Sequence, residues 1–137
     1  KEMRMKQEVV LGIGGKRTMN ALELEPAVWH MNEGHSAFLA LERIRQRVQL
    51  QGLDFNSALQ VVAASTVFTT HTPVPAGNEV FHIDMMRRYF AGFAEELGID
   101  FTRLMSFGQP PVDAAPTTGA ACWGGRGGST SRGPRQR

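Results

Sequence analysis

The sequence has 137 residues, of which 42% are hydrophobic, and a formal charge of +2. This length and composition suit about one domain with a hydrophobic core. Residues 109–137 contain four arginines and one acid, so 11 basic and 12 acidic residues remain before them and their formal charge is −1. Net charge therefore gives no support to a nucleic-acid-binding function for residues 1–108. The single cysteine, Cys122, excludes a disulfide framework and a cysteine-based metal site.

Residues 109–137 differ in composition from the rest of the chain. They hold six of the 15 glycines and four of the seven prolines, and they lack apolar periodicity. This composition predicts a disordered tail. The abrupt change near Phe107 is what a GC-rich gene read in a wrong frame would give, and a natural disordered linker is the alternative. Because we find no signal peptide and no apolar run near 18 residues, we expect a soluble, cytoplasmic protein.

The first part of the chain predicts two helices and a strand. Residues 2–11 have a helical pattern, which we expect the glycines of LGIGG (11–15) to end, and a second short helix is expected over 16–22. After Pro26, the run AVWHM (27–31) is typical of a short buried strand.

The clearest predicted element is the long helix that follows. Apolar residues recur at helical spacing along one face: Ala37, Leu41, Ile44 and Val48. The opposite face carries polar residues: Glu42, Arg43, Gln46 and Arg47. Gly52 is expected to end this helix. Asp54 is expected to cap the next one, with a buried face of Phe55, Ala58, Leu59 and Val62.

The second half of residues 1–108 predicts one strand and two helices. STVFTTH (65–71) is rich in β-branched residues and uncharged, as in a buried parallel strand. Helices are expected over 83–97, ended by Gly98, and over about 101–107. The order strand, two helices, strand, helix predicts an α/β fold with a parallel sheet.

Polar residues follow both predicted strands. Asn32, Glu33 and His35 follow the first, while His71 ends the second, 39 residues after Asn32, and Thr72 follows it. In parallel α/β sheets, ligands bind beyond the carboxyl ends of the strands, so these residues form a candidate site. An alternative is that the first three residues hydrogen-bond exposed amides at the start of the long helix. Spacing alone leaves both interpretations open.

Other sites have weaker support. A dinucleotide-binding loop at GIGGKR would need a glycine where Arg17 stands, and the preceding segment is helical. A metal set is conceivable but matches no zinc spacing: His30, Glu33, His35 and His71. We also expect His30 to point to the opposite side of its strand from its neighbours.

Two further polar residues have simple interpretations. Glu33 and Glu79 have the residue types of a carboxylate pair for glycoside hydrolysis, but nothing in the sequence fixes their separation. His82 is expected to be a solvated or capping residue at the start of a helix.

Two long stretches resemble α-glucan phosphorylases, the glycogen, starch and maltodextrin phosphorylase family: HMNEGHSAFLALERIR (30–45) and ASTVFTTHTPVPAGNEVF (64–81). Together with KQEVVLGIGG (6–15), they are most similar to the shorter bacterial and archaeal branch. The resemblance extends over about residues 1–108. It implies a two-lobed glycosyltransferase fold (GT-B type) of two Rossmann-like domains, with this chain as an internal fragment of the N-terminal lobe.

The resemblance also implies an activity for the longer parent. An α-1,4-glucan or maltodextrin and inorganic phosphate would give α-glucose 1-phosphate and a chain one glucose shorter. The family uses pyridoxal 5′-phosphate through its phosphate group, held by a lysine of the C-terminal lobe. We therefore expect this fragment to be inactive and not to bind the cofactor. We expect no nucleic-acid, membrane or metal partner, and an oligomer of the parent is compatible with the resemblance.

Residue by residue, His71 matches the family histidine that hydrogen-bonds the transferred glucosyl unit, and Thr72 is its motif neighbour. Glu79 falls on an acidic position of the loop that lines the acceptor side. The alternatives are a nucleotide-sugar-dependent glycosyltransferase of the same architecture and a non-catalytic fragment or accessory sugar-binding piece.

The segment Asn32–His35 corresponds to an Asn-Asp-Thr-His motif of the longer enzymes at the acceptor sugar subsite. Asn32 and His35 match the ends of that motif, Glu33 stands at its aspartate and Gly34 at its threonine. The chemistry agrees, because phosphorolysis has a cationic sugar-like transition state between two phosphate groups. Neutral, directional donors such as histidine, asparagine and threonine can hold the sugar hydroxyls without adding competing carboxylates.

Overall fold

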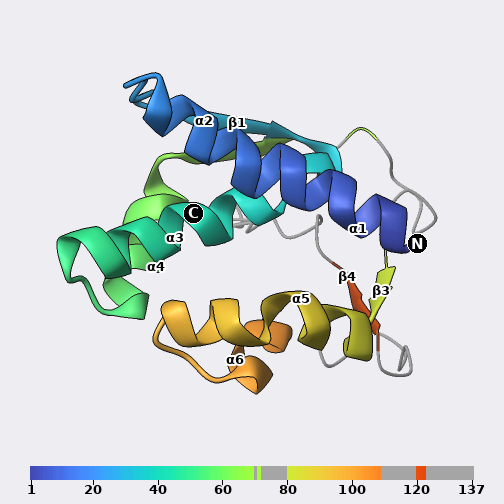
Figure 1. Ribbon diagram of the computed structural model, residues 1–137. Coiled ribbons are helices and arrows are strands. Elements are labelled where there is room, and N and C mark those ends of the chain that lie inside the picture. Colours follow the sequence, from blue (N-terminus) through green and yellow to red (C-terminus); the bar gives the residue numbers. More distant parts are fainter. Residues whose placement is uncertain (70, 72–79, 109–119, 123–137) are drawn as a thin grey trace, which may run out of the picture.

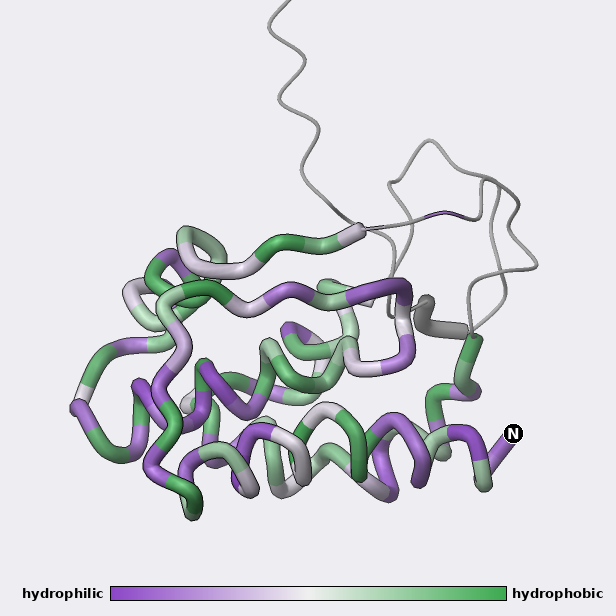
Figure 2. The backbone as a smooth tube through the Cα atoms, turned by 90° about the horizontal axis from the view of Figure 1, so that it is seen from above, coloured by the Kyte–Doolittle hydropathy of each residue, from purple (hydrophilic) through white to green (hydrophobic). Residues whose placement is uncertain are grey.

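The computed structural model describes residues 1–69, 71, 80–108 and 120–122. Figure 1 shows helices α1 and α2 lying along one side of a small sheet, with α3 and α4 beside them, while α5 and α6 form a further layer next to α3. Figure 2 shows that hydrophilic and hydrophobic residues alternate along the helices, as expected of helices with one buried face.

The chain begins with one continuous helical segment. It comprises α1 (Glu2–Val9), the π-helical segment η1 (Val10–Gly14) and α2 (Gly15–Ala21). Gly14 and Gly15 have right-handed helical dihedral angles, so the prediction that the glycines end a helix here is wrong. A Cβ on Gly12 would lie 2.6 Å from the backbone nitrogen of Leu39. The glycine is thus required for close packing and not for helix termination.

The end of α2 is a Schellman motif. The N–H of Leu24 donates to the carbonyl of Met19, and the N–H of Glu23 donates to the carbonyl of Asn20, both at 2.9 Å. Glu23 has a φ of 57°, a left-handed conformation that glycine usually adopts at this position. This motif turns the chain towards the first strand.

The two predicted strands form a parallel pair. β1 (Trp29–Asn32) pairs with β2 (Thr66–Thr69), with Asn32 opposite Thr69. Their connection contains the 3-10 helix η2 (Glu33–Ser36), α3 (Phe38–Gln51) and α4 (Phe55–Ala64). This confirms the parallel pair with a two-helix crossover. The register brings the carboxyl ends of both strands level with each other.

A second, antiparallel pair was not predicted. β3 (Val80–His82) pairs with β4 (Ala120–Cys122). β4 belongs to the segment expected to be a disordered tail, and the remainder of that segment lies outside the residues that the structure describes. The described chain is therefore a mixed helix and strand fold with a small parallel sheet, compatible with an α/β class.

Local signals at the helix ends are confirmed. Gly52, with a φ of 68°, ends α3, and Gly98, with a φ of 72°, follows α5 (Ile83–Glu96). The side chain of Asp54 accepts from the backbone N–H groups that begin α4. His82 caps α5, because its Nδ1 accepts from the N–H of Asp84 at 3.3 Å. The final helix, α6 (Phe101–Ser106), was also predicted.

The core joins α3 to the C-terminal helices. Phe38, the first residue of α3, is fully buried; its ring centroid lies 4.5 Å from that of Phe90 and 6.4 Å from that of Phe81. The predicted core positions that are buried include Leu41, Ile44, Phe55, Ala58 and Val62, and Met86 and Leu97 are buried as well. Phe38 thereby anchors the chain immediately after the candidate site.

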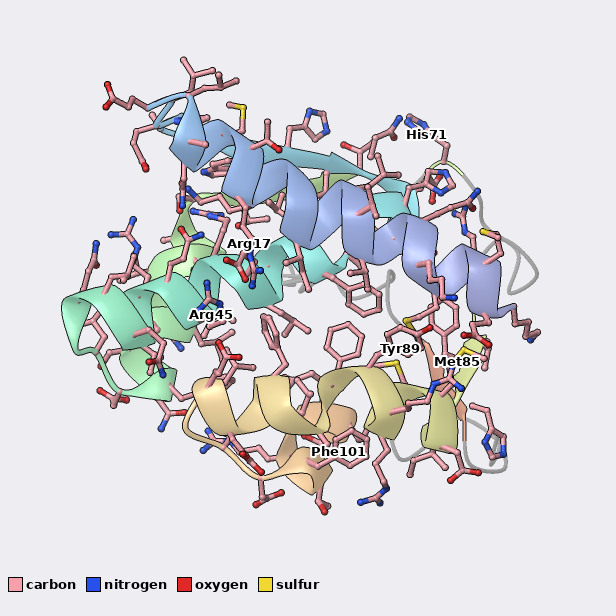
Figure 3. All side chains as sticks on the ribbon, viewed as in Figure 1. Arg17, Arg45, His71, Met85, Tyr89 and Phe101 are labelled. Atoms are coloured by element: carbon pink, nitrogen blue, oxygen red, sulfur yellow. The ribbon has the colours of Figure 1, made fainter. Side chains whose placement is uncertain are left out.

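Two residues on the polar face of α3 are buried. Glu42 has 0% and Arg43 5% of its surface exposed. Burial raises the pKa of Glu42, but hydrogen bonds from Arg45, Arg17 and Gln46 outweigh burial and hold the pKa below its ordinary value. Figure 3 shows Arg17 and Arg45 close together beside α3. Since Arg17 comes from α2, packing of α2 on this face explains the burial, which helical periodicity alone does not indicate.

Arg43 connects α3 to the start of β2. Its guanidinium donates to the Thr66 hydroxyl at 2.5 Å and to the Ser65 hydroxyl at 2.6 Å. A buried cation is costly unless it is hydrogen-bonded, so Arg43 must keep these partners in the folded protein. It fixes β2 relative to the helix that follows β1.

Candidate functional site

Glu33 and His71 lie together at the carboxyl ends of the parallel strands. The backbone N–H of His71 donates to Oε1 of Glu33, although the two residues are 38 positions apart in the sequence. Figure 3 shows His71 at the edge of the molecule near the end of the small sheet. The predicted meeting of the two polar clusters is therefore observed for these residues.

The backbone of Glu33 is in a strained conformation. Its φ is 58°, in the left-handed region, which costs a residue with a Cβ about 1–2 kcal/mol. Asn32 before it is still extended, with φ −103° and ψ 111°. The change of direction takes the chain from β1 into η2 while the Glu33 carboxylate reaches the end of β2. Strain of this kind clusters at functional sites.

The two N-cap residues of this segment do not cap their helices with side chains. Asn32, the N-cap of η2, and Ala37, the N-cap of α3, make no side-chain capping hydrogen bond. The Glu33 carboxylate accepts from the neighbouring strand end instead.

Asn32 and His35 are exposed on the same loop. Nδ1 of His35 contacts the guanidinium of Arg4 from α1. Arg4 is held in turn by Glu8, whose Oε1 accepts from its Nε at 3.1 Å. Sequence reasoning missed Arg4, because it lies 31 residues before His35 and no local pattern indicates the contact.

The remaining candidates are not part of this contact. Nε2 of His30 lies 2.6 Å from the Thr69 hydroxyl, so His30 makes a side-chain contact across the sheet. Thr72 and Glu79 lie outside the described residues, as does the proposed pairing of Glu79 with Glu33. Within residues 1–69, 71, 80–108 and 120–122, no group of three histidine, cysteine, aspartate or glutamate side chains could hold a metal ion. The same residues include no helix long and apolar enough to cross a membrane.

A cavity of about 490 Å³ lies at the opposite, amino end of the sheet. Its lining includes Trp29, Lys16 and Arg43. The Lys16 ammonium lies 4.9 Å and the Arg43 guanidinium carbon 5.4 Å from the centre of the Trp29 ring. The lining contains neither His71 nor any residue of 30–36, so this cavity is separate from the loop that carries Glu33.

Chemically, the site offers exposed histidine and asparagine side chains beside one half-buried carboxylate. Imidazole and amide groups are neutral, directional hydrogen-bond partners. They suit a ligand with several hydroxyl groups. The Glu33 carboxylate is the acidic group that contacts the backbone N–H of His71.

Comparison with known proteins gives the family relationship. No family model matches the chain. A glycogen phosphorylase from Mycobacterium tuberculosis is 55% identical over 93 residues, which are 64% of this chain and 11% of that protein. A maltodextrin phosphorylase from Thermococcus litoralis is 48% identical over 99 residues, which are 72% of this chain and 12% of that protein. The resemblance to the α-glucan phosphorylases is confirmed.

More distant phosphorylases give the same picture. A glycogen phosphorylase from Aquifex aeolicus is 28% identical over 113 residues, which are 82% of this chain and 16% of that protein. The chain thus spans between 11% and 16% of the length of these three phosphorylases. It corresponds to a fragment of an α-glucan phosphorylase-related protein.

Proposed function

We propose that this chain is part of the N-terminal lobe of a two-lobed, GT-B type α-glucan phosphorylase. The longer protein cleaves terminal α-1,4-linked glucose with inorganic phosphate and releases α-glucose 1-phosphate. The similarity to glycogen and maltodextrin phosphorylases supports this proposal. The observation that carries it is the contact between Glu33 and His71, because it joins the two motif-bearing stretches at the sheet edge where α/β folds bind ligands.

In this proposal, the His71 side chain binds a hydroxyl of the glucosyl unit that is transferred. Asn32, Glu33 and His35 bind the sugar on the acceptor side. The Glu33 carboxylate accepts from the His71 backbone N–H and so fixes where β2 ends and where the histidine side chain starts. Such fixed geometry lowers the entropy cost of reaching the transition state. Thr72 and Glu79 complete this surface in the proposal.

The family implies a pyridoxal 5′-phosphate cofactor, whose phosphate donates and accepts a proton when bound. The three lysines of the sequence do not fit a pyridoxal site. The Lys1 ammonium donates to the Val80 carbonyl, Lys6 pairs with Glu2, and Lys16 contacts Asn20 and Glu25. None of these contacts involves the loop of Glu33 or His71. We propose that the cofactor belongs to the longer protein and that this chain does not bind it.

The competing enzyme class is a nucleotide-sugar-dependent glycosyltransferase. The test is to supply the longer protein with maltodextrin and inorganic phosphate and to measure glucose 1-phosphate. Parallel reactions omit phosphate or replace it with a sugar nucleotide. We expect release that depends on phosphate and needs no sugar nucleotide. Glucosyl transfer only from a sugar nucleotide would overturn the proposal.

A further inference from the structure

We infer that the continuous helix α1–η1–α2 is the positioning element of the glucan site, with Gly12 and Arg4 as its two contact points. Gly12 fixes the loop that carries Glu33, and Arg4 orients the imidazole of His35. The role assigned to this loop rests on the proposed function.

The first contact is between backbones. A Cβ on Gly12 would lie 2.6 Å from the Leu39 nitrogen, 3.0 Å from the Phe38 carbonyl carbon and 3.2 Å from the Ser36 oxygen. All three atoms belong to the backbone where η2 passes into α3. Backbone atoms cannot swing aside as a flexible side chain can, so any residue larger than glycine must displace the loop or the helix.

The loop is held from two sides. Phe38, directly after η2, is fully buried against Phe81 and Phe90. On the other side, η1 contacts both η2 and α3. If α1–η1–α2 moves, Phe38 cannot move with it without opening the core. The movement therefore displaces η2, whose first residue is Glu33.

The π-helical segment coincides with this contact. η1 covers Val10–Gly14 and is centred on Gly12. π-helical turns widen a helix locally and occur frequently at functional sites. Here the segment lies where α1–η1–α2 approaches the loop most closely, while α1 and α2 continue as regular helices on either side.

The second contact is between side chains. The Arg4 guanidinium contacts Nδ1 of His35, and Arg4 is held by Glu8, which is 1% exposed. A guanidinium can only donate hydrogen bonds, so Nδ1 of His35 must be the acceptor. The neutral ring then carries its proton on Nε2. That N–H is the donor that a sugar hydroxyl would meet.

The two contacts lead to a distinct kinetic expectation. Without the Arg4 contact, the His35 ring can rotate and its proton can lie on either nitrogen. The reacting groups of the other lobe are unchanged. It should weaken glucan binding and raise KM for maltodextrin about tenfold, with kcat changed less than about twofold. A purely structural role would instead lower the apparent kcat in proportion to the amount of folded enzyme and leave KM unchanged.

The chain offers a matched control for Gly12. Gly15 lies in the same continuous helix, and a Cβ there would meet nothing within 4 Å. We therefore compare Gly12→Ala with Gly15→Ala by amide hydrogen exchange in the 137-residue chain. The expected result is faster exchange of the His71 amide in Gly12→Ala alone, because the Glu33 carboxylate moves away from it. Equal exchange in both variants would overturn the positioning role of Gly12.

Arg4→Gln tests the second contact and keeps the inference falsifiable if Gly12→Ala does not fold. In nitrogen-detected NMR of the histidine rings, we expect the wild type to show the His35 tautomer with its proton on Nε2, and Arg4→Gln to show a mixture of the Nε2-H and Nδ1-H tautomers. Arg4→Lys, which retains a cationic donor, should restore the wild-type tautomer in part. An unchanged tautomer ratio in Arg4→Gln refutes the orienting role.

The same variants in the longer protein separate this inference from the proposed function. If the wild type releases glucose 1-phosphate, we expect Arg4→Gln to raise KM for maltodextrin and Gly15→Ala to leave KM unchanged. An unchanged KM in Arg4→Gln would refute the inference and leave the proposed function intact. If the wild type is inactive, the proposed function fails, and hydrogen exchange and histidine NMR still decide whether the helix positions the loop.

Discussion

Replacing Glu42 by glutamine should lower the free energy of unfolding by about 2–3 kcal/mol. Glu42 is 0% exposed, and its two oxygens accept hydrogen bonds from Arg17, Arg45 and Gln46. Removing one partner of a buried ion pair costs about 3–5 kcal/mol. The Arg17 side chain is 55% and the Arg45 side chain 21% exposed. Both cations therefore keep part of their hydration, which places the cost at or below the lower end of that range.

Urea unfolding followed by circular dichroism at neutral pH measures this cost. The matched control is Arg17→Gln, which removes the more exposed partner and should cost about 1 kcal/mol or less. If Glu42→Gln costs no more than Arg17→Gln, the carboxylate is not a buried charge that the helices share, and the reasoning fails.

The pH dependence gives a second check on Glu42. Its pKa is lowered in the folded protein from an ordinary value of 4.5. The folded state therefore binds this proton less readily than the unfolded state. The stabilisation from Glu42 is present above pH 4.5 and is lost as the pH falls through the lower folded pKa. The difference between wild type and Glu42→Gln should shrink in acid, and a difference that grows there would contradict the assigned direction.

Three further predictions concern single features. Glu23→Gly should raise the free energy of unfolding by about 0.5–1 kcal/mol. Glycine removes the strain of the left-handed backbone, and this gain exceeds the extra entropy of glycine in the unfolded chain; a fall in the melting temperature would contradict this. Asp54→Ala should lower stability by about 1 kcal/mol through loss of the α4 cap, and Asp54→Asn, which retains an acceptor, should restore most of it. The purified 137-residue chain, mixed with pyridoxal 5′-phosphate, should show no protein-bound absorbance band after dialysis, and a retained band would refute that expectation.

Sequence reasoning succeeded where the signal is local. Gly52 and Gly98 end helices through their own backbone conformation, and Asp54 caps α4 through amides two and three residues away. The strand pair followed from two short β-rich runs joined by two amphipathic helices. These features need no knowledge of distant residues.

It failed where the cause is distant in the sequence. Gly12 lies in a glycine-rich run that is typical of a helix end. The structure shows instead that a glycine is needed there because the backbone of residues 38–39 packs against it. Glu42 lies opposite the apolar face of its helix, where a solvated residue is usual. It is buried because α2 packs there and supplies Arg17 as its partner. β3 and β4 have three residues each, too few for a periodic pattern.

The candidate site was predicted in part. The ends of the strands indicated Glu33 and His71, and the structure joins them. The contact of Arg4 with His35 could not be predicted, because it depends on how α1 packs across the loop. The left-handed φ of Glu33 also has no sequence signal, since glutamate does not favour that conformation.

The most direct test of the central claim is the rate of glucose 1-phosphate formation by the longer protein carrying Glu33→Gln, compared with His30→Gln. The two residues are near neighbours, but His30 contacts Thr69 within the sheet while Glu33 contacts His71 at its end. We expect Glu33→Gln to lower kcat/KM for maltodextrin about tenfold or more and His30→Gln to change it less than about twofold. Equal effects of the two substitutions would contradict a glucan site at the carboxyl ends of β1 and β2.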